Sequence, residues 1–158
     1  MPVESRAPLW RRPRQARNKF VTRPRFHLAF PVRDLAEARA FYGGVLGCPE
    51  GRSAPDWVDF DFHGHQIVAH LAPAESAAPT SLVDGAAVPV RHFGVILAPV
   101  AWRELADRLA AAKAPFLIQP QTRFAGEPGE QSTLFVTDPS GNALEFKAFA
   151  DDAQVFAR

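Results

Sequence analysis

Two histidines and one glutamate occupy places in this sequence where they could bind a metal together. His27 lies in the apolar segment FHLAFPV, and His92 lies 65 residues later in the similar segment RHFGVIL. Glu145 interrupts the apolar stretch NALEF. A carboxylate that faces an interior is costly unless a positive group compensates it. Two imidazoles and one carboxylate are the usual ligands of non-haem Fe(II) in oxygenases, so these residues favour Fe(II), with manganese, zinc and nickel as alternatives.

Each of these residues also has a purely structural interpretation. A single histidine beside apolar neighbours is more often a satisfied core or rim residue than a ligand. Strand residues alternate between faces, so Glu145 could point at water, or pair with a cation such as Arg123. The equivalent positions of His27 and His92 in two similar halves favour the metal interpretation.

A second set of candidate residues lies within the predicted strand HQIVAHL. Gln66, Val68 and His70 share one face of this strand because side chains alternate with a period of two. Aligning the glycine turns that precede the two strands places Val68 opposite Glu145, so the fourth ligand of a symmetric site is missing. His70 and Gln66 flank Val68 and could either support the metal ligands or contact the substrate. We expect a substrate contact from Gln66, and for His70 an acid/base or substrate role, with a structural role as the alternative.

The elements that must position these residues follow the same order twice. Each half reads strand, helix, strand, strand, and another short strand is expected in each. Asp34 is a suitable N-cap for the first helix, and the second helix is amphipathic. The predicted strands are 26–32, 57–62 and 65–71, then 91–97, 116–124, 132–138 and 142–149, with the second helix at 100–114.

The remaining segments bound the domain. Residues 72–89 are rich in Ala, Pro and Ser, which predicts a linker or loop. The first 25 residues carry eight basic side chains and one acid. We favour a disordered leader there over a nucleic-acid-binding arm. The predicted organisation is a leader at 1–24, one domain at 25–150 with modules at 25–72 and 90–150 and a linker at 73–89, and a tail at 151–158.

Composition excludes several classes of protein. The 158 residues are 47% hydrophobic and 22% charged, with a formal net charge of +1, as in an ordinary globular protein. The single cysteine, Cys48, excludes an intramolecular disulfide and a cysteine-based zinc site. No apolar run is long enough to span a membrane, and no secretion signal begins the chain. We therefore expect a cytoplasmic protein with no membrane partner.

The motifs resemble those of the vicinal-oxygen-chelate superfamily, which includes glyoxalase I, bleomycin- and fosfomycin-resistance proteins and extradiol dioxygenases. The resemblance covers about residues 25 to 150 and rests on FHLAFPVRDL, FYGGVLGCPEGR, WVDFDFHGHQIVAHL, HFGVIL and PGEQSTLFVTDPSGNALEFKAF. These segments are similar above all to bacterial proteins described as predicted extradiol-type dioxygenases. The resemblance implies an α+β fold in which two βαβββ modules form a curled sheet around a metal cleft.

The resemblance also implies roles for particular residues. His27, His92 and Glu145 are expected to bind Fe(II), which holds both oxygens of a catechol-like substrate and O2. His70 matches the histidine that serves as acid/base. Substrate contacts are expected from Gln66, Arg123 and Phe135, and a homodimer is expected. The family's substrate-binding tyrosine has no match, because its strand offers Phe135 and Val136, and the only tyrosine, Tyr42, lies in the first helix.

Two other functions stay open at this point. A non-oxidative lyase, epimerase or thiol transferase would use the metal as a Lewis acid to stabilise an enolate or oxyanion. A drug-sequestering protein of the bleomycin-resistance kind would bind its ligand in a dimer cleft without catalysis. The sequestering function does not require the two histidines and the glutamate together, so their presence counts against it.

Overall fold

The computed structural model describes residues 23–72 and 79–156, which form two βαβββ modules. The expected leader lies mostly outside these residues, as do parts of the linker and the end of the tail. The first module contains β1 (His27–Val32), α1 (Leu35–Ala38), η1 (Arg39–Val45), β2 (Glu50–Ala54), β3 (Trp57–Phe62) and β4 (His65–Leu71). The second contains β7 (His92–Leu97), α2 (Pro99–Ala111), β8 (Phe116–Arg123), β9 (Gln131–Thr137) and β10 (Ala143–Phe149).

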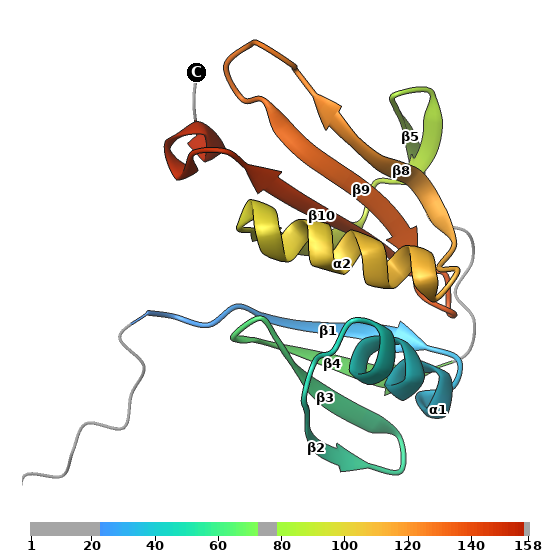
Figure 1. Ribbon diagram of the computed structural model, residues 1–158. Helices are drawn as coiled ribbons and strands as arrows, with labels where there is room; N and C mark the ends of the chain where they lie inside the picture. The colour runs from blue at the N-terminus through green and yellow to red at the C-terminus, as the bar shows by residue number, and fades with distance from the viewer. Residues whose placement is uncertain (1–22, 73–78, 157–158) are drawn as a thin grey trace, which may run out of the picture.

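The two modules have the same sheet topology, as Figure 1 shows. The strand orders are β1-β4-β3-β2 and β7-β10-β9-β8. In the first sheet β1 runs parallel to β4, and in the second β7 runs parallel to β10. The other neighbouring strands are antiparallel. The expected α+β fold of two curled βαβββ modules is therefore confirmed.

One face of each sheet packs into a shared core. Phe30, Phe62 and Phe146 belong to one buried cluster that also contains residues of both helical segments. The Phe93 ring lies 5.2 Å from that of Phe30 and 6.0 Å from that of Phe62, and α2 lies between the two sheets (Figure 1). Because each core face points toward the other module, the opposite faces of the two sheets point away from each other.

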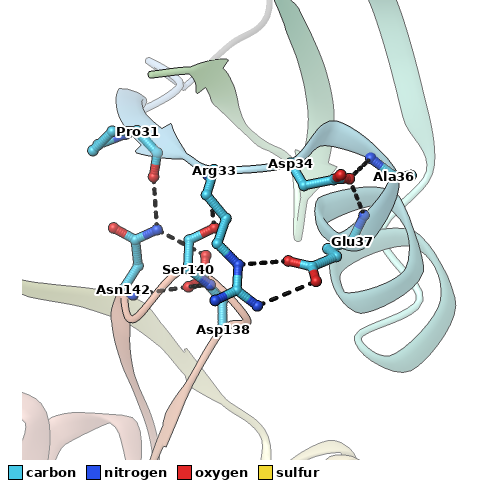
Figure 2. A network of polar contacts seen from close by, with 8 residues as sticks. All are labelled: Pro31, Arg33, Asp34, Ala36, Glu37, Asp138, Ser140 and Asn142. Carbon is cyan, nitrogen blue, oxygen red and sulfur yellow. Dashed lines mark hydrogen bonds and ion pairs between the residues drawn. The ribbon is translucent and has the colours of Figure 1, made fainter. Parts of the chain in front are cut away.

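The turn between β9 and β10 joins the modules through a buried carboxylate. Asp138 is 3% exposed, and its Oδ1 accepts hydrogen bonds from the backbone N–H groups of Ser140 and Asn142. The Asn142 amide donates to Asp138 and to the Pro31 carbonyl in the first module, and Tyr42 donates its hydroxyl hydrogen to Asp138. Figure 2 shows how this turn meets the end of β1. The turn sets where β10 begins, and therefore which face Glu145 takes.

The first helix begins as expected and then departs from α-helical geometry. Asp34 accepts hydrogen bonds from the N–H groups of Ala36 and Glu37, which makes it the N-cap (Figure 2). From Arg39 the helix continues as π-helix through the pair Gly43 and Gly44. Glycine has low α-helical propensity, so this pair offers little resistance to the wider turn.

The expected linker is wrong for residues 80–89, which form a hairpin. Strands β5 (Thr80–Val83) and β6 (Ala86–Pro89) are joined by Asp84 and Gly85, both with positive φ. An Asp-Gly pair between two apolar runs is a strong hairpin signal, and the Ala-rich context hid it. Val88 shares a buried cluster with Ile118 and Phe135, so the hairpin covers part of the second sheet's free face.

Two smaller differences concern strands. Pro120 lies at a register shift within a continuous β8, since a proline cannot donate to the sheet ladder. The alternation of apolar and acidic residues in β3 is typical of a strand with one wet face, but Asp59 is only 6% exposed. No helix in the described part of the chain is long and apolar enough to cross a bilayer.

Candidate metal-binding site

The free face of the second sheet brings His92 and Glu145 together. His92 begins β7, and Glu145 lies on the neighbouring β10, opposite Gly94. The Nε2 atom of His92 lies 3.4 Å from Oε2 of Glu145. The Glu145 side chain is 10% exposed, so this contact lies largely out of water.

The hydrogen bond of the other ring nitrogen identifies the tautomer of His92. Its Nδ1 lies 3.0 Å from the backbone carbonyl oxygen of Pro89. A carbonyl only accepts, so Nδ1 carries the proton and donates it. In the neutral ring, Nε2 then presents a lone pair toward Glu145. The Phe135 ring meets the imidazole edge-on at 5.1 Å, which also fixes the plane of the ring.

Glu145 has two further polar neighbours. Thr133 donates a hydrogen bond to Oε1 at 2.9 Å. The ammonium nitrogen of Lys147 lies 3.3 Å from Oε2. The first contact fixes the carboxylate, and the second supplies positive charge on the side of Oε2 that faces His92.

His27 belongs to a different group of residues on the free face of the first sheet. Its Nδ1 lies 2.9 Å from Oε1 of Gln66, with which it is paired in the register of β1 and β4. Gln66 donates from Nε2 to Oδ2 of the buried Asp59 at 2.9 Å. Gln66 thus contacts a candidate ligand, and its contact with a substrate stays a prediction.

One chain does not bring the three candidate ligands together. Glu145 lies on the free face of one sheet and His27 on the free face of the other, with the shared core between them. Within residues 23–72 and 79–156, no group of three or more His, Cys, Asp or Glu side chains is close enough to hold an ion. The single chain therefore presents the expected ligands as a pair and a separate histidine.

The register places Val68 at the position equivalent to that of Glu145. Val68 pairs with the second residue after His27, as Glu145 pairs with the second residue after His92. Val68 is thus the counterpart of Glu145, and it is 7% exposed. An apolar side chain cannot bind a metal there.

The remaining predicted residues lie in three different places. His70 is on the same face as Gln66 but pairs with Pro31, about 13 Å along the strand from Gln66. Arg123 forms an ion pair with Asp84 of the hairpin at 3.0 Å. Phe135 lies beside His92 on the free face of the second sheet.

Sequence reasoning missed three polar residues on these faces, Lys147, Thr133 and Asp59. Lys147 was detectable, since it follows Glu145 by two residues and shares its face. Gln131 is a possible polar contact by sequence, with a surface position near a turn as the alternative. Gln131 is 8% exposed, and its Oε1 has no hydrogen-bond partner among the described residues.

The donors on the second sheet fit a divalent metal. Two lone-pair donors that face each other at 3.4 Å repel, and a cation between them would remove the repulsion that Lys147 already reduces from beside Oε2. Two ligands about 2.1 Å from one ion lie roughly 3.0 to 3.4 Å apart at ordinary coordination angles. Imidazole and carboxylate together suit iron, manganese, zinc and nickel, which leaves the choice of metal open.

The other reactive side chains of the described residues are arranged to stay unreactive. Burial raises the pKa of the Cys48 thiol to about 11, with Asp61 adding to the effect, so the thiolate is scarce at neutral pH. Burial, followed by the nearby Asp138, raises the pKa of Tyr42 well above its usual value. Tyr42 therefore keeps the proton that it donates to Asp138 and does not reach either free face.

Comparison with known proteins identifies the family of the chain. The model of the glyoxalase/bleomycin resistance protein/dioxygenase superfamily matches residues 26–146. The chain belongs to this superfamily. A superfamily protein from Alicyclobacillus acidocaldarius is 36% identical, with a TM-score of 0.72 over 84% of this chain and 96% of that one. No protein of curated function matches the chain.

More distant members of the superfamily share the fold. A variant of the fosfomycin resistance protein FosX from Listeria monocytogenes, in complex with Mn(II) and 1S,2S-dihydroxypropylphosphonic acid, is 15% identical. Its TM-score is 0.65 over 87% of this chain and 98% of that one. A glyoxalase/dioxygenase from Nostoc punctiforme is 19% identical, with a TM-score of 0.60 over 82% and 92% of the two chains.

Proposed function

We propose that this protein is an enzyme dependent on a divalent metal that acts on a small substrate with two adjacent oxygen atoms. The observation that carries the proposal is the contact between His92 and Glu145. Nε2 of His92 lies 3.4 Å from a carboxylate oxygen, while its Nδ1 is held by a backbone carbonyl. Ligating histidines in metal enzymes are held in this way by a hydrogen bond from the other nitrogen.

We further propose that the third ligand, His27, comes from a second copy of the chain. His27 is exposed at the start of β1 and lies on the sheet face that points away from Glu145. A two-fold dimer that sets the free face of one first sheet against the free face of the partner's second sheet would form two identical sites. This arrangement accounts for a ligand set that one chain leaves divided.

The metal, when bound, would act as a Lewis acid on the substrate oxygens, and in the Fe(II) form it would also bind O2. Several groups of the chain can serve the substrate directly. The Lys147 ammonium, beside Glu145, can stabilise negative charge that develops on a substrate oxygen. Phe135 and Val88 form an apolar wall that excludes water.

Ring cleavage of a catechol-like substrate by an Fe(II) dioxygenase is the form of the reaction that we put first. The donor set of two imidazoles and one carboxylate is that of non-haem Fe(II) oxygenases and leaves ligand positions for substrate and oxygen. Val68 supports this form, because it excludes the fourth protein ligand that would occupy one of these positions. The acid/base role of His70 stays a prediction, since His70 shares the free face of the first sheet with Gln66 but lies about 13 Å along the strand from it.

A non-oxidative Lewis-acid reaction is the second candidate, and the position of Tyr42 favours it. Tyr42 is fully buried and bonded to Asp138, so the tyrosine that extradiol enzymes commonly direct at their substrate has no counterpart on either free face. The Mn(II) complex of the structurally similar FosX supports a redox-neutral metal in this fold. Lys147 would serve an oxyanion intermediate equally well.

The experiment that separates the candidates is metal analysis followed by oxygen uptake. The protein is purified without chelator and without oxygen, its metal is quantified, and O2 consumption is followed with a panel of catechols. Bound iron with substrate-dependent uptake supports the dioxygenase. Manganese, zinc or nickel without uptake supports the Lewis-acid reaction. If the protein holds no metal and binds none when titrated with Fe(II), Mn(II), Zn(II) or Ni(II), both candidates are wrong, and sequestration of a ligand becomes the better explanation.

A further inference from the structure

A chain of polar contacts runs from His27 into the first sheet. Its first bond joins Nδ1 of His27 to Oε1 of Gln66 at 2.9 Å, across the paired strands β1 and β4. Its second bond joins Nε2 of Gln66 to Oδ2 of Asp59 on β3, also at 2.9 Å. All three side chains lie on the free face of the sheet, opposite the core residues of the same strands.

The chemistry of the last member determines the direction of every bond. The Asp59 carboxylate accepts hydrogen bonds, so the amide nitrogen of Gln66 must face it. The amide oxygen of Gln66 must then face His27, and an amide oxygen only accepts. Nδ1 of His27 is therefore the donor, and Nε2 is left with a free lone pair. The identity of residue 59 thus decides the tautomer of a histidine two strands away.

Asp59 is held in place at a cost that the packing of the sheet does not explain. It is 6% exposed, and its Oδ1 has no hydrogen-bond partner among the described residues. The nearest cation, Arg52, lies 3.8 Å from Oδ2 and is largely exposed. Gly51 leaves room for the carboxylate, since a Cβ there would collide with Oδ1. A buried, poorly compensated carboxylate destabilises a sheet, so a role for Asp59 other than packing is expected.

The second module orients its histidine by different means. The counterpart of Gln66 in the register is Ala143, and the counterpart of Asp59 is Phe135. His92 donates to a backbone carbonyl and rests against an aromatic ring. Both modules present Nε2, but only the first uses side chains to do so, and these can be changed without altering a backbone contact.

We propose that Gln66 and Asp59 are positioning residues that hold His27 in the Nδ1-protonated tautomer, with Nε2 free to bind the metal. This inference rests on the proposed function for the identity of the group that Nε2 meets. Partners of this kind typically contribute about 10- to 100-fold to metal affinity. We expect Gln66→Leu and Asp59→Asn to lower affinity for Mn(II) within this range without removing it.

The double substitution Asp59→Asn with Gln66→Glu is the conservative control. It keeps the size of both side chains and exchanges their roles: the new amide at position 59 donates, and the new carboxylate at position 66 accepts from both neighbours. His27 then still has an acceptor at Nδ1. We expect the double variant to recover the wild-type tautomer, and an affinity above that of either single variant.

The test is nuclear magnetic resonance of ¹⁵N-histidine in the metal-free full-length protein, at a pH of about 8.5, where imidazoles are neutral. The His27 signals, assigned by their loss in His27→Ala, should show the Nδ1-protonated form in wild type and in the double variant. Gln66→Leu should shift them toward the Nε2-protonated form. Wild-type His27 protonated at Nε2, or a tautomer unchanged in Gln66→Leu, would overturn the inference.

A parallel Mn(II) titration keeps this test separate from that of the proposed function. If wild type binds no metal but shows the expected tautomers, the proposed function fails while the orienting role of Gln66 and Asp59 stands. If the tautomers fail while metal binds, the inference fails alone. A Gln66 or Asp59 that served only packing would change the unfolding midpoint and leave the His27 tautomer as it was.

Discussion

His27 and His92 present the same ring nitrogen, Nε2, although different groups hold their Nδ1 atoms. Gln66 holds the first and the carbonyl of Pro89 holds the second. The shared outcome is what a common ligand role requires, because a ring protonated at Nε2 cannot bind a metal there. Two histidines that served only packing would have no reason to agree in this respect.

Glu145 is the residue whose loss should weaken metal binding most. Glu145→Gln keeps the shape and the hydrogen bond from Thr133 but removes the negative charge. Loss of a residue that only orients a ligand lowers metal affinity by about 10- to 100-fold, so loss of the ligand itself should lower Mn(II) affinity by more. Isothermal titration measures this, and circular dichroism should show the fold retained. Glu104→Gln on the exposed surface of α2 is the control and should bind Mn(II) like wild type. Equal affinities in the two variants would contradict the ligand role.

Tyr42 has a structural role that can be tested through pH. Tyr42→Phe removes a buried hydrogen bond to Asp138 and should lower the free energy of unfolding by about 1 to 3 kcal/mol in urea titrations at neutral pH. The pKa of Tyr42 is raised in the folded protein. As the pH rises above about 10, the unfolded chain loses its tyrosine proton first, so wild type should lose stability that the variant does not.

Ionisation of Cys48 also lowers stability at high pH, but it does so in wild type and in Tyr42→Phe alike. The difference in unfolding free energy between the two proteins therefore reports Tyr42 alone. The pKa of Cys48, about 11 in the folded state, is also raised. Tyr42 is the single tyrosine of the chain, which lets tyrosinate absorbance report its ionisation directly. If wild type and Tyr42→Phe have the same free energy of unfolding at neutral pH and above a pH of about 10, the bond between Tyr42 and Asp138 does not join the modules as described.

Site residues could be predicted from the sequence where their side-chain chemistry is unusual for the segment that contains them. His27, His92 and Glu145 could be selected because imidazole and carboxylate groups in apolar strands need an explanation. Asp59 could not, because alternation in WVDFDF is also the pattern of a strand with one wet face. Burial of that face depends on Gly51 and Gln66, which come from other strands, and a pattern within one strand does not report them.

Among the secondary-structure elements, the close approach of β7 to β10 depends on Gly94. This glycine lies opposite Glu145 in the register, and a Cβ there would collide with the Glu145 backbone carbonyl. Gly94→Ala should therefore move β10 at the ligand, destabilise the protein by about 1 to 3 kcal/mol, and weaken Mn(II) binding. Thermal unfolding and isothermal titration measure the two effects.

Gly44→Ala is the matched control for this substitution. Gly44 is exposed, a Cβ added to it would have no heavy atom within 4 Å, and it does not need positive φ. We expect a change within about 0.5 kcal/mol and unaltered metal binding. If Gly94→Ala behaves like Gly44→Ala, the strands can separate without disturbing Glu145, and the register does not position the ligand.

Element order was predictable because hydrophobic periodicity carries it. The seven predicted strands and both helices are present, with boundaries close to those expected. The hairpin of β5 and β6 was missed because each strand has only four residues and lies in a segment rich in Ala, Pro and Ser, where alternation gives a weak signal. The hairpin matters for the site, since Val88 shields Phe135, which in turn contacts His92.

For the molecule as a whole, the sequence indicated that two modules would share a site but not whether one chain completes it. The internal symmetry of the two modules is compatible with free faces that meet within one chain and with free faces that point away from each other. The aromatic contacts of Phe30, Phe62 and Phe93 decide the matter, because they place the core between the sheets and leave both candidate faces outward. These contacts form between modules, and no periodicity within a strand reports them.

Each metal site, as proposed, takes His27 from one chain and His92 with Glu145 from the other. Complementation between two defective chains can therefore restore a site that neither chain forms alone. His27→Ala and Glu145→Gln carry different tags, are refolded together, and the mixed dimers are purified through both tags. One of the two sites in each mixed dimer would then contain all three native ligands, and the other would lack two.

The measurement is the amount of Mn(II) bound tightly per mixed dimer. We expect half of the wild-type amount for the mixed dimer and almost none for either variant alone. Mixed dimers that bind no more than the single variants, or a protein that stays monomeric while binding metal at full stoichiometry, would contradict the shared site.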